Sequence, residues 1–398
     1  MRGRLLVFNQ YYWPCFEADG RLLTQLCEAL AADWEITVVT GALPQAGSGR
    51  AWRNGVEIVR VPSTAFERRR LALRALNYGS FFALAAARGL IAERPDIVLS
   101  YTNPPFVGDL AYAAARRFRA PLVVAVQDVF PEAAVALGRL ESPLVAGALG
   151  AMVGFYLRRA DRVVAIGETM RRRLEAKGVA RERIAVIENW VDPEAIRPAA
   201  QANGWSEAHG LAGRFVVMHS GNVGHAQDLD TLVRAGALLR DDDLALVVAG
   251  SGARLAEIRT LADALRAPVR FLPYQPPEVL SESLSAAAVH VVGLARGLAG
   301  YVVPSRLYGV LSAGRPVIAA AEDDAETAML VRDVGCGVVV PPGDPEALAA
   351  AIRAAHGGEY DLDGMGRRGR DYVVREASRE AAVSRYGALL AEVLRSGS

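Results

Sequence analysis

The sequence contains few of the residues that build disulfide frameworks or metal centres. Its 398 residues include three cysteines and five histidines. Because Cys15, Cys27 and Cys336 are scattered and odd in number, they indicate a reduced, cytoplasmic protein. Neither residue type occurs at the spacing of zinc ligands, so we expect no structural or catalytic zinc.

Long apolar runs are also missing. The longest uncharged apolar stretch, PLVAGALGAMVGFYL at 143–157, is shorter than the roughly 20 residues that a helix needs to cross a bilayer. The chain begins with MRGRLLVFNQYYWP, whose apolar part suits a first strand and is too short for a signal peptide. We therefore expect no segment that crosses a membrane.

Charge of one sign is not in excess. The 45 lysine and arginine residues balance the 44 aspartate and glutamate residues and leave a formal net charge of +1. This balance creates no global field that attracts nucleic acid, and we expect no nucleic-acid partner. Arginines cluster locally at 68–70 and 171–173. Such clusters are usually solvated helix faces, and a contact with phosphate or anionic lipid is the alternative.

Short β-branched runs alternate with helix-length segments along the whole chain. The first half contains RLLVF, EITVVT, DIVLS and PLVVAV, and the second half contains RFVVMHSG, LALVVAG and PVIAAA. This alternation indicates an α/β protein whose parallel sheets are covered by helices on both faces. Because the chain is too long for one ordinary core, we expect two domains.

The alternation lapses around residues 189–213, which include several prolines and glycines and show little apolar periodicity. We therefore predict a first Rossmann-like domain at 1–195, a linker at 196–213, a second Rossmann-like domain at 214–378 and a closing helix at 379–398. Ligands of doubly wound sheets bind beyond the carboxyl ends of the strands. We expect the two doubly wound domains to face each other across a ligand-binding cleft.

Glycines follow two predicted strands of the second half. The segment HSGNVG supplies Gly221 and Gly224, and AGSG supplies Gly250 and Gly252. Glycine at such turns lets a ligand approach backbone N–H groups, and the start of the following helix attracts anions. Tight strand-to-helix turns need glycine in any case, so a purely structural role is equally open.

Ser305 and Arg306 stand at a predicted helix start. The segment VPSRLYGVLSAG places Ser305 at the N-cap and Gly314 at the helix end. In the simpler interpretation Ser305 is only a cap and Arg306 is solvated. In the other interpretation the hydroxyl, free N–H groups and the guanidinium converge on a pyrophosphate.

Polar residues follow a predicted buried strand of the first half. The segment PLVVAVQDVFPEAA places Gln127, Asp128 and Glu132 directly after the strand, at the edge where ligands bind. Two carboxylates at this position are candidates for chemistry. A structural turn with an aspartate cap is the alternative, because aspartate and proline often mark turns.

Taken in order, these motifs resemble those of the retaining glycosyltransferases of family 4, which adopt the two-domain GT-B fold. The bacterial WbuB-type subgroup, which builds O-antigen, capsule and exopolysaccharide, is the most similar in style. The resemblance covers essentially the whole chain and rests on NQYYWP, GRLLTQLCEAL, TNPPFVG, QDVFPEAAVALG, RRADRVVAIGETMRRRL, IENWVD, HSGNVGHAQDLDTL, VAGSGARL, VPSRLYGVLSAGRPVIA and GCGVVVPPGDPEALAAAI.

The resemblance implies transfer of a sugar from a nucleotide-diphospho-sugar, with a UDP-sugar favoured, and retention of the anomeric configuration without a metal or other cofactor. The second domain is then expected to hold most of the donor. The residues implied around its diphosphate and nucleoside are Gly221, Asn222, Gly224, Gly250, Gly252, Ser305, Arg306, Leu307 and Glu326.

The same resemblance implies that the first domain binds the acceptor. Asp128, with Gln127 and Glu132, is expected to face the reacting sugar and the acceptor. Tyr11, Asp19 and Asn103, which lie within or beside the motifs near the N-terminus and TNPPFVG, are the implied acceptor-binding residues.

The chain departs from the family pattern in its glutamates. Gly309 stands where the family usually has a glutamate thought to bind ribose hydroxyls, and Tyr301 stands at the usual partner position. Met329 occupies another expected glutamate position, with Glu326 one turn earlier as a substitute, and Gln127 replaces a frequent histidine. These departures make a catalytically impaired nucleotide-sugar-binding protein an alternative to an enzyme.

The subgroup often uses polyprenyl-diphosphate-linked sugars, which implies a lipid-linked or glycan acceptor and peripheral contact with the cytoplasmic face of the inner membrane. One segment, FERRRLALRALNYGSFFALAAARGLI, places Phe81 and Phe82 beside basic residues; another, PLVAGALGAMVGFYLRR, ends in Arg158 and Arg159. A buried helix is the alternative for both. A soluble glycosyltransferase for a small-molecule acceptor and a UDP-GlcNAc epimerase are the other functions that remain open.

Overall fold

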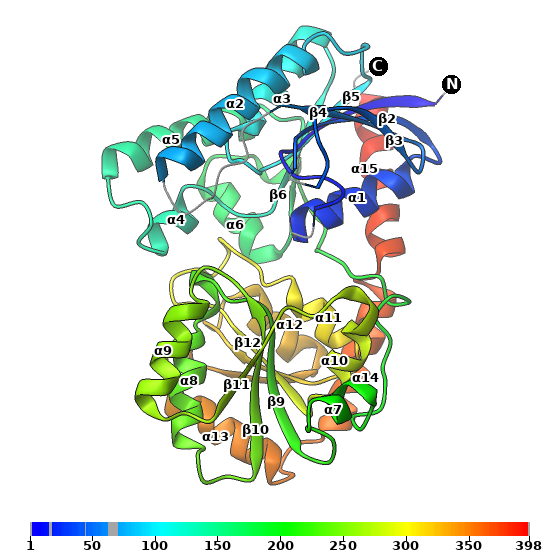
Figure 1. Cartoon of the computed structure of the whole chain (residues 1–398). Helices are drawn as coiled ribbons and strands as arrows, with labels where there is room; N and C mark the ends of the chain where they lie inside the picture. Colours follow the sequence, from blue (N-terminus) through cyan, green and yellow to red (C-terminus); the bar gives the residue numbers. More distant parts are fainter. Residues whose placement is uncertain (1, 16–17, 44, 63–70, 397–398) are drawn as a thin grey trace. The chain divides into compact units, whose positions relative to one another are not determined.

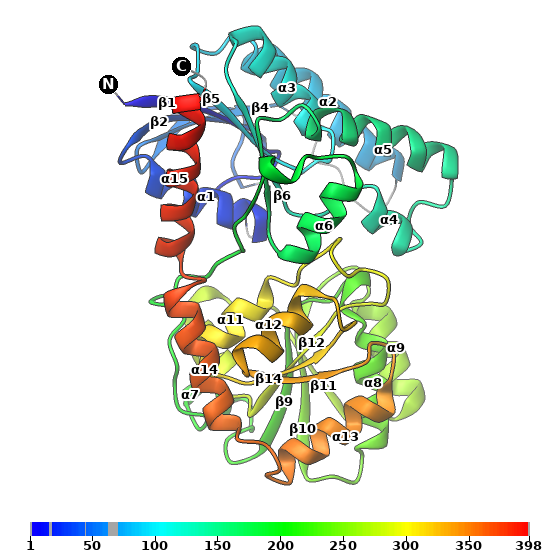
Figure 2. The same cartoon turned by 180° about the vertical axis from the view of Figure 1, so that it is seen from behind.

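The computed structural model describes residues 2–15, 18–43, 45–62 and 71–396. The chain forms two compact units, the first containing residues 1–188 and 380–398 and the second containing residues 189–379. Each unit has its own sheet with helices on both faces (Figure 1 and Figure 2). The expectation of two doubly wound, Rossmann-like units is confirmed.

The first sheet has eight strands in the order β3-β4-β2-β1-β5-β6-β7-β8, and only the edge strand β3 is antiparallel to its neighbour. Its central strands β5 and β6 are buried along their whole length, as expected for a parallel sheet covered on both faces. The strands are β1 (Gly3–Phe8), β2 (Trp34–Gly41), β3 (Gly49–Arg53), β4 (Val56–Val61), β5 (Ile97–Tyr101), β6 (Leu122–Val126), β7 (Arg162–Ala165) and β8 (Ile184–Val186).

Helices α1 (Ala18–Leu30) and α15 (Arg379–Ser396) lie on one face of this sheet, and α2 (Leu71–Gly89), α3 (Val107–Phe118) and α5 (Pro143–Leu157) lie on the other (Figure 1 and Figure 2). Two shorter helices, α4 (Glu132–Ala136) and α6 (Glu168–Ala176), follow β6 and β7. The C-terminal helix α15 is attached to the unit through the buried Tyr386. An ion pair between Arg162 Nη2 and Glu392 Oε1, 2.5 Å apart, adds to this attachment.

The second sheet has six parallel strands in the order β11-β10-β9-β12-β13-β14. The strand order runs outward in both directions from β9 and β12, so the topological switch point lies between these two strands. The strands are β9 (Phe215–Asn222), β10 (Leu244–Ser251), β11 (Val269–Leu272), β12 (Val289–Gly293), β13 (Val317–Ala320) and β14 (Gly337–Val340).

Both faces of the second sheet are covered by packed helices (Figure 1 and Figure 2). One face carries α8 (Leu229–Leu238), α9 (Leu255–Leu265) and α13 (Pro345–His356), and their core includes Leu232 and Ile352. The other face carries α10 (Leu280–Ser285), α11 (Arg306–Ser312), α12 (Glu326–Val334) and α14 (Leu362–Arg375), and its core includes Leu311 and Val373. These two cores hold the carboxyl ends of the strands in place.

The segment predicted as a linker, 196–213, is folded into the second unit. It contains the short helix α7 (Gly204–Ala208), where Asn203 Oδ1 accepts a hydrogen bond from Ser206 N at 2.9 Å. Trp205 is buried, and its Nε1 donates to Gln275 Oε1 at 2.8 Å. The units divide at residue 188 rather than 195, and most of the predicted closing helix belongs to the first unit. The segment looked like a linker in the sequence because the short helix α7, with the buried Trp205, is too short to show an apolar periodicity.

For the first segment considered for membrane contact, the burial of Phe81 favours the alternative of a buried helix. Its basic cluster at 68–70 lies outside the described residues, and Phe81 is fully buried in the first unit rather than exposed. Phe82 is partly buried and packs edge-on against Phe106. Of the helices that the structure describes, none is long and apolar enough to span a membrane.

Candidate functional site

The carboxyl ends of β9 and β10 meet at paired glycines. Gly250 stands opposite Gly221 in the strand register, and a Cβ at position 250 would lie 1.8 Å from the Gly221 carbonyl oxygen. A Cβ at Gly252 would lie 2.3 Å from the Val223 carbonyl oxygen. The close approach of the two strand ends therefore requires both glycines, which supports the structural interpretation of these two positions.

Gly221 has a φ of +128°, in the region that favours glycine, and it lies next to Arg306. A Cβ at position 221 would be 4.0 Å from Arg306 Nε. The structure thus brings together the glycine turn after β9 and the arginine at the start of α11, which are far apart in the sequence. Backbone amides and a guanidinium at one place form a suitable environment for an anion.

The turn after β9 is stabilised by its own side chains. Gln227 Oε1 accepts a hydrogen bond from Gly224 N at 2.9 Å and lies 3.5 Å from Asn222 Nδ2. Asp228 then accepts from Thr231 Oγ1 at 2.9 Å and from Gly343 N at 2.9 Å. These bonds fix the path of residues 222–228 without using the Arg306 guanidinium.

His219 contacts Arg306 and was not among the predicted site residues. It is completely buried near the end of β9, and Arg306 Nη1 lies 3.2 Å from its Nδ1 and 3.1 Å from its Nε2. Nε2 also lies 3.3 Å from the Asn222 carbonyl oxygen. Burial and the positive charge of Arg306 lower the pKa of His219 well below its ordinary value, so the imidazole is neutral near neutral pH.

The helix start around Arg306 differs from the prediction. Ser305 occupies the N-cap position, but its backbone is already helical and its side chain makes no capping hydrogen bond. Leu307 is buried in the core, and its N–H donates to the Pro304 carbonyl oxygen at 3.2 Å, so neither its side chain nor its amide is presented to a donor. The sequence of the seven-residue helix α11 does not indicate the backbone conformation of Ser305 or the burial of Leu307. Glu326 is the first residue of α12, after β13.

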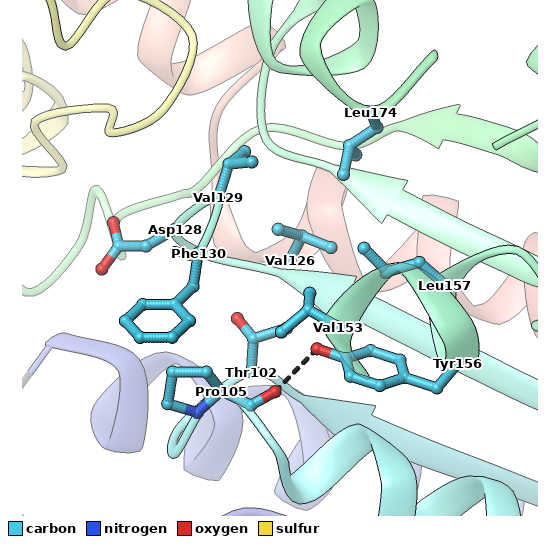
Figure 3. Close-up of a pocket in the computed structure, with 10 residues that line it drawn as sticks. All are labelled: Thr102, Pro105, Val126, Asp128, Val129, Phe130, Val153, Tyr156, Leu157 and Leu174. Atoms are coloured by element: carbon cyan, nitrogen blue, oxygen red, sulfur yellow. Dashed lines mark hydrogen bonds between the residues drawn. The ribbon is translucent and has the colours of Figure 1, made fainter. Parts of the chain in front are cut away.

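Asp128 follows β6 at the carboxyl edge of the first sheet. In Figure 3 its carboxylate points away from the apolar side chains behind it, which include Val126, Val153 and Leu174. These side chains line a cavity of about 10 Å³, roughly the space of one water molecule. Tyr156 closes this group by donating to the Pro105 carbonyl oxygen at 2.7 Å. The loop that carries Asp128 therefore rests on a well-packed base.

The surroundings of Asp128 change its acidity. Solvent reaches the residue, yet nearby protein displaces enough water from the carboxylate, with help from the negative charge of Asp19, to raise its pKa to about 7. Asp19 is held by Asn103, whose Nδ2 lies 3.4 Å from Asp19 Oδ2. The structure thus brings the predicted residues Asp19, Asn103 and Asp128 to one edge of the first sheet.

The other predicted site residues of this unit, Gln127, Tyr11 and Glu132, make contacts within the unit. Gln127 is buried, its N–H donates to Thr102 Oγ1 at 3.1 Å, and its side-chain Nε2 has no hydrogen-bond partner among the described residues. Tyr11 is buried, and its carbonyl oxygen accepts from Asn9 Nδ2 at 2.8 Å. Glu132 Oε1 pairs with Lys177 Nζ at 2.6 Å and so connects α4 to the end of α6. This ion pair gives Glu132 a structural role that the sequence did not indicate.

The described part of the chain contains no cluster of acidic, histidine and cysteine side chains that resembles a metal site. Over residues 2–15, 18–43, 45–62 and 71–396, no three of them are placed to hold a metal ion. Each unit therefore has its own group of candidate residues. The second unit contains Gly221, Asn222, His219 and Arg306, and the first unit contains Asp19, Asn103 and Asp128.

Comparison with known proteins matches both units. A family model described as glycosyl transferase 4-like domain matches residues 20–190, and one described as glycosyl transferases group 1 matches residues 214–356. The first contains the Asp128 loop, and the second contains His219, Gly221 and Arg306.

Alignments with related proteins cover most of this chain. The glycosyl transferase WcaI of Escherichia coli K12, named for colanic acid biosynthesis, is 28% identical over 379 residues, which are 88% of this chain and 92% of WcaI. The glycosyltransferase WbjE of Pseudomonas aeruginosa is 29% identical over 310 residues, 76% of each chain. The solved structure of HepE from Anabaena in complex with UDP has a TM-score of 0.75 at 16% identity, and the match covers 98% of this chain and 100% of HepE.

HepE is too distant in sequence to show more than the fold, which it shares over both units. WcaI and the two family models carry the assignment of the family. The chain belongs to the family 4 glycosyltransferases and has the GT-B fold.

Proposed function

We propose that the protein transfers a sugar from a UDP-sugar to a lipid-linked or glycan acceptor in the synthesis of a cell-surface polysaccharide, with retention of the anomeric configuration. The observation that carries this proposal is the apposition of Gly221 and Arg306 in the second unit. Two comparisons support it, because WcaI is named for colanic acid biosynthesis and HepE has been solved with UDP and with UDP-glucose.

Arg306 and the backbone amides of 221–224 form the proposed site of the donor diphosphate. The planar guanidinium matches the geometry of phosphate oxygens and keeps its charge at every physiological pH. Burial lowers the pKa of Arg306 to about 10, which still leaves it charged near neutral pH. Gly221 places no Cβ between its amide and the arginine, so a phosphate can approach both.

Transfer places negative charge on the diphosphate as the bond to the sugar breaks. A fixed positive charge at that position stabilises the leaving group more strongly in the transition state than in the ground state. We assign this role to Arg306, whose charge acts where a metal ion acts in other transferases. Retention and independence of a metal remain inferences from the family resemblance.

The first unit is proposed to bind the acceptor around Asp128. Because the pKa of Asp128 is raised to about 7, its carboxyl group can hold or release a proton near neutral pH. Asp19 and Asn103 supply acceptor and donor groups suited to sugar hydroxyls. Asp128 is therefore the residue that we assign to the reacting hydroxyl, and Asp19 and Asn103 are assigned to positioning it.

Helix α5 is proposed to contact an anionic membrane surface that carries the acceptor. The helix exposes Leu144 and Val145, of which 86% and 47% are accessible, and Phe155 near its other end. The Arg159 guanidinium lies 3.9 Å from the centre of the Phe155 ring, and the neighbouring Arg158 is exposed. Exposed apolar side chains beside arginines match the apolar interior and negative headgroups of a lipid surface.

The reaction itself is tested with purified protein, a panel of UDP-sugars and a polyprenyl-diphosphate-linked sugar. We expect transfer with the donor's anomeric configuration in the product, read by NMR, and the same rate after chelation with EDTA. An inverted product, or a rate that falls with EDTA and recovers with magnesium, would contradict the mechanism. Conversion of a UDP-sugar to its epimer without acceptor would instead identify an epimerase.

A further inference from the structure

His219 is a buried polar residue beside the donor site to which the proposed reaction gives no role. This histidine has no surface exposure, and its ring contacts both the Asn222 carbonyl oxygen, at 3.3 Å, and the Arg306 guanidinium, at 3.1 and 3.2 Å. The ring therefore connects the two parts of the diphosphate site, namely the glycine-rich turn and the arginine.

The chemistry of the imidazole suits this connection. A neutral imidazole has one N–H donor and one nitrogen lone pair. Its N–H can donate to the main-chain carbonyl oxygen of Asn222 or Val291. Arg306 Nη1 lies 3.2 Å from Nδ1 and 3.1 Å from Nε2, so it contacts the imidazole ring as a whole. Because burial and the adjacent Arg306 lower the pKa of His219, the protonated form, which would repel the guanidinium, is disfavoured.

The absence of a carboxylate from this contact has a consequence for Arg306. Among the described residues the polar contacts of its guanidinium are those with His219, and no acidic group contributes to its pKa. A carboxylate would orient an arginine but would also neutralise it. A neutral imidazole orients the guanidinium and leaves its full charge for an anion.

We propose that His219 is a positioning residue, which holds the Arg306 guanidinium in place against the diphosphate of the donor through the close contact of the guanidinium with the neutral imidazole ring. This inference rests on the proposed function, because it takes Arg306 as the diphosphate ligand. His219 does not itself touch the donor, and it acts only through Arg306 and the Asn222 turn.

The test uses three substitutions of differing reach and the probe UDP, with uridine as a probe that lacks phosphates. His219→Gln places an amide oxygen near Arg306 and keeps a donor for the main-chain carbonyl. His219→Asn keeps polar groups in the buried site but is too short to reach both partners. His219→Leu removes both hydrogen-bonding functions at similar volume. Circular dichroism and thermal unfolding establish which variants are folded.

We expect His219→Asn and His219→Leu to weaken UDP binding about tenfold in calorimetry and His219→Gln to restore most of it, while uridine binding is unchanged in all three. In a double-mutant cycle, His219→Leu should have little further effect once Arg306→Ala is present, because the two residues act as one unit. In transfer assays, KM for the donor should rise and kcat should fall, with the glutamine variant again closest to the wild type.

Two results distinguish an error in the role of His219 from an error in the proposed diphosphate site. If Arg306→Ala weakens UDP binding but folded His219→Asn does not, or if the two effects add, His219 does not position Arg306. If Arg306→Ala itself leaves UDP binding unchanged, the proposed diphosphate site is wrong, and the role of His219 is overturned with it.

Discussion

Asp19 and Asp128 influence each other at the carboxyl edge of the first sheet. The pKa of Asp128 is raised to about 7, chiefly because protein replaces water around its carboxylate and additionally because Asp19 is negatively charged. A carboxyl group of this kind is ionised less readily in the folded than in the unfolded chain. Ionisation of Asp128 therefore destabilises the folded chain. The same raised pKa lets the carboxyl group exchange a proton near neutral pH, as a catalytic group must.

Replacing Asp128 with asparagine should separate activity from stability. Between the unfolded pKa near 4 and the folded pKa near 7, the unfolded chain binds fewer protons, so Asp128 makes the wild type less stable as pH rises. We expect Asp128→Asn to lower kcat by at least about a hundredfold and to be relatively more stable at pH 8 than at pH 4. Urea unfolding and transfer assays measure the two effects. Equal stability differences at both pH values would refute the raised pKa.

His290 on β12 should make the second unit sensitive to acid. It is fully buried, and burial lowers its pKa to about 4, although its Nε2 contacts the Leu284 carbonyl oxygen at 2.9 Å. The unfolded chain gains a proton near pH 6.5 that the folded chain takes up only near pH 4, so stability falls as pH drops through this range. From pH 7 to 5 this histidine should cost about 2 kcal/mol of unfolding free energy.

The comparison of His290→Gln with the wild type isolates this effect, because His219 acts in the same direction in both proteins. Urea unfolding at pH 7 and pH 5 should show a smaller loss of stability in the glutamine variant. If both proteins lose the same free energy, His290 is not the group that titrates.

Much of the fold could be predicted from the sequence because it depends on repeated local patterns. The alternation of buried strands and helices produced two doubly wound sheets, and the motifs around Gly221 and Arg306 proved to be neighbours. The position of α7 could not be predicted, since it depends on the single buried Trp205. The sequence left open whether Phe81 is buried or contacts a membrane, because an apolar helix face looks the same in sequence whether it packs on a domain or on a lipid surface.

Within the site, contacts between distant residues could not be predicted. Glu132 pairs with Lys177 and His219 contacts Arg306 only because the fold brings their elements together. The signal for His219 was its place, since a histidine near the end of a buried strand at the topological switch point needs polar partners. The sequence motif places Leu307 directly after Arg306 but does not show that the Leu307 side chain is buried in the core.

Two glycine-to-alanine substitutions should have opposite effects in the second unit. Gly250→Ala would place a Cβ 1.8 Å from the Gly221 carbonyl oxygen, so it should cost about 1–3 kcal/mol and displace the turn. Gly309→Ala would meet Ile196 and Leu284 at 3.7 and 3.8 Å, which is ordinary contact, and should stabilise α11 by about 0.5–1 kcal/mol. Thermal unfolding and UDP calorimetry on both variants check these expectations. A loss of UDP binding in folded Gly309→Ala would show that position 309 contributes to the donor site.

The membrane contact of α5 can be tested with two matched valines. Val145 on α5 and Val374 on α14 are both 47% exposed, but only Val145 belongs to the proposed lipid-binding surface. We expect Val145→Asp to reduce flotation with vesicles that contain phosphatidylglycerol several-fold, and Val374→Asp to have no effect. Wild-type protein that stays away from such vesicles at low salt would favour a soluble enzyme with a small-molecule acceptor.

The central claim, that Arg306 binds the donor diphosphate, is tested most directly by calorimetric titration of UDP into the wild type, Arg306→Ala and the exposed control Arg332→Ala. Loss of one charge-assisted phosphate contact, roughly 1.5–3 kcal/mol, predicts at least about tenfold weaker binding by Arg306→Ala. The control variant should match the wild type, and all three should unfold at similar temperatures. Equal UDP affinity in the wild type and Arg306→Ala would contradict the account.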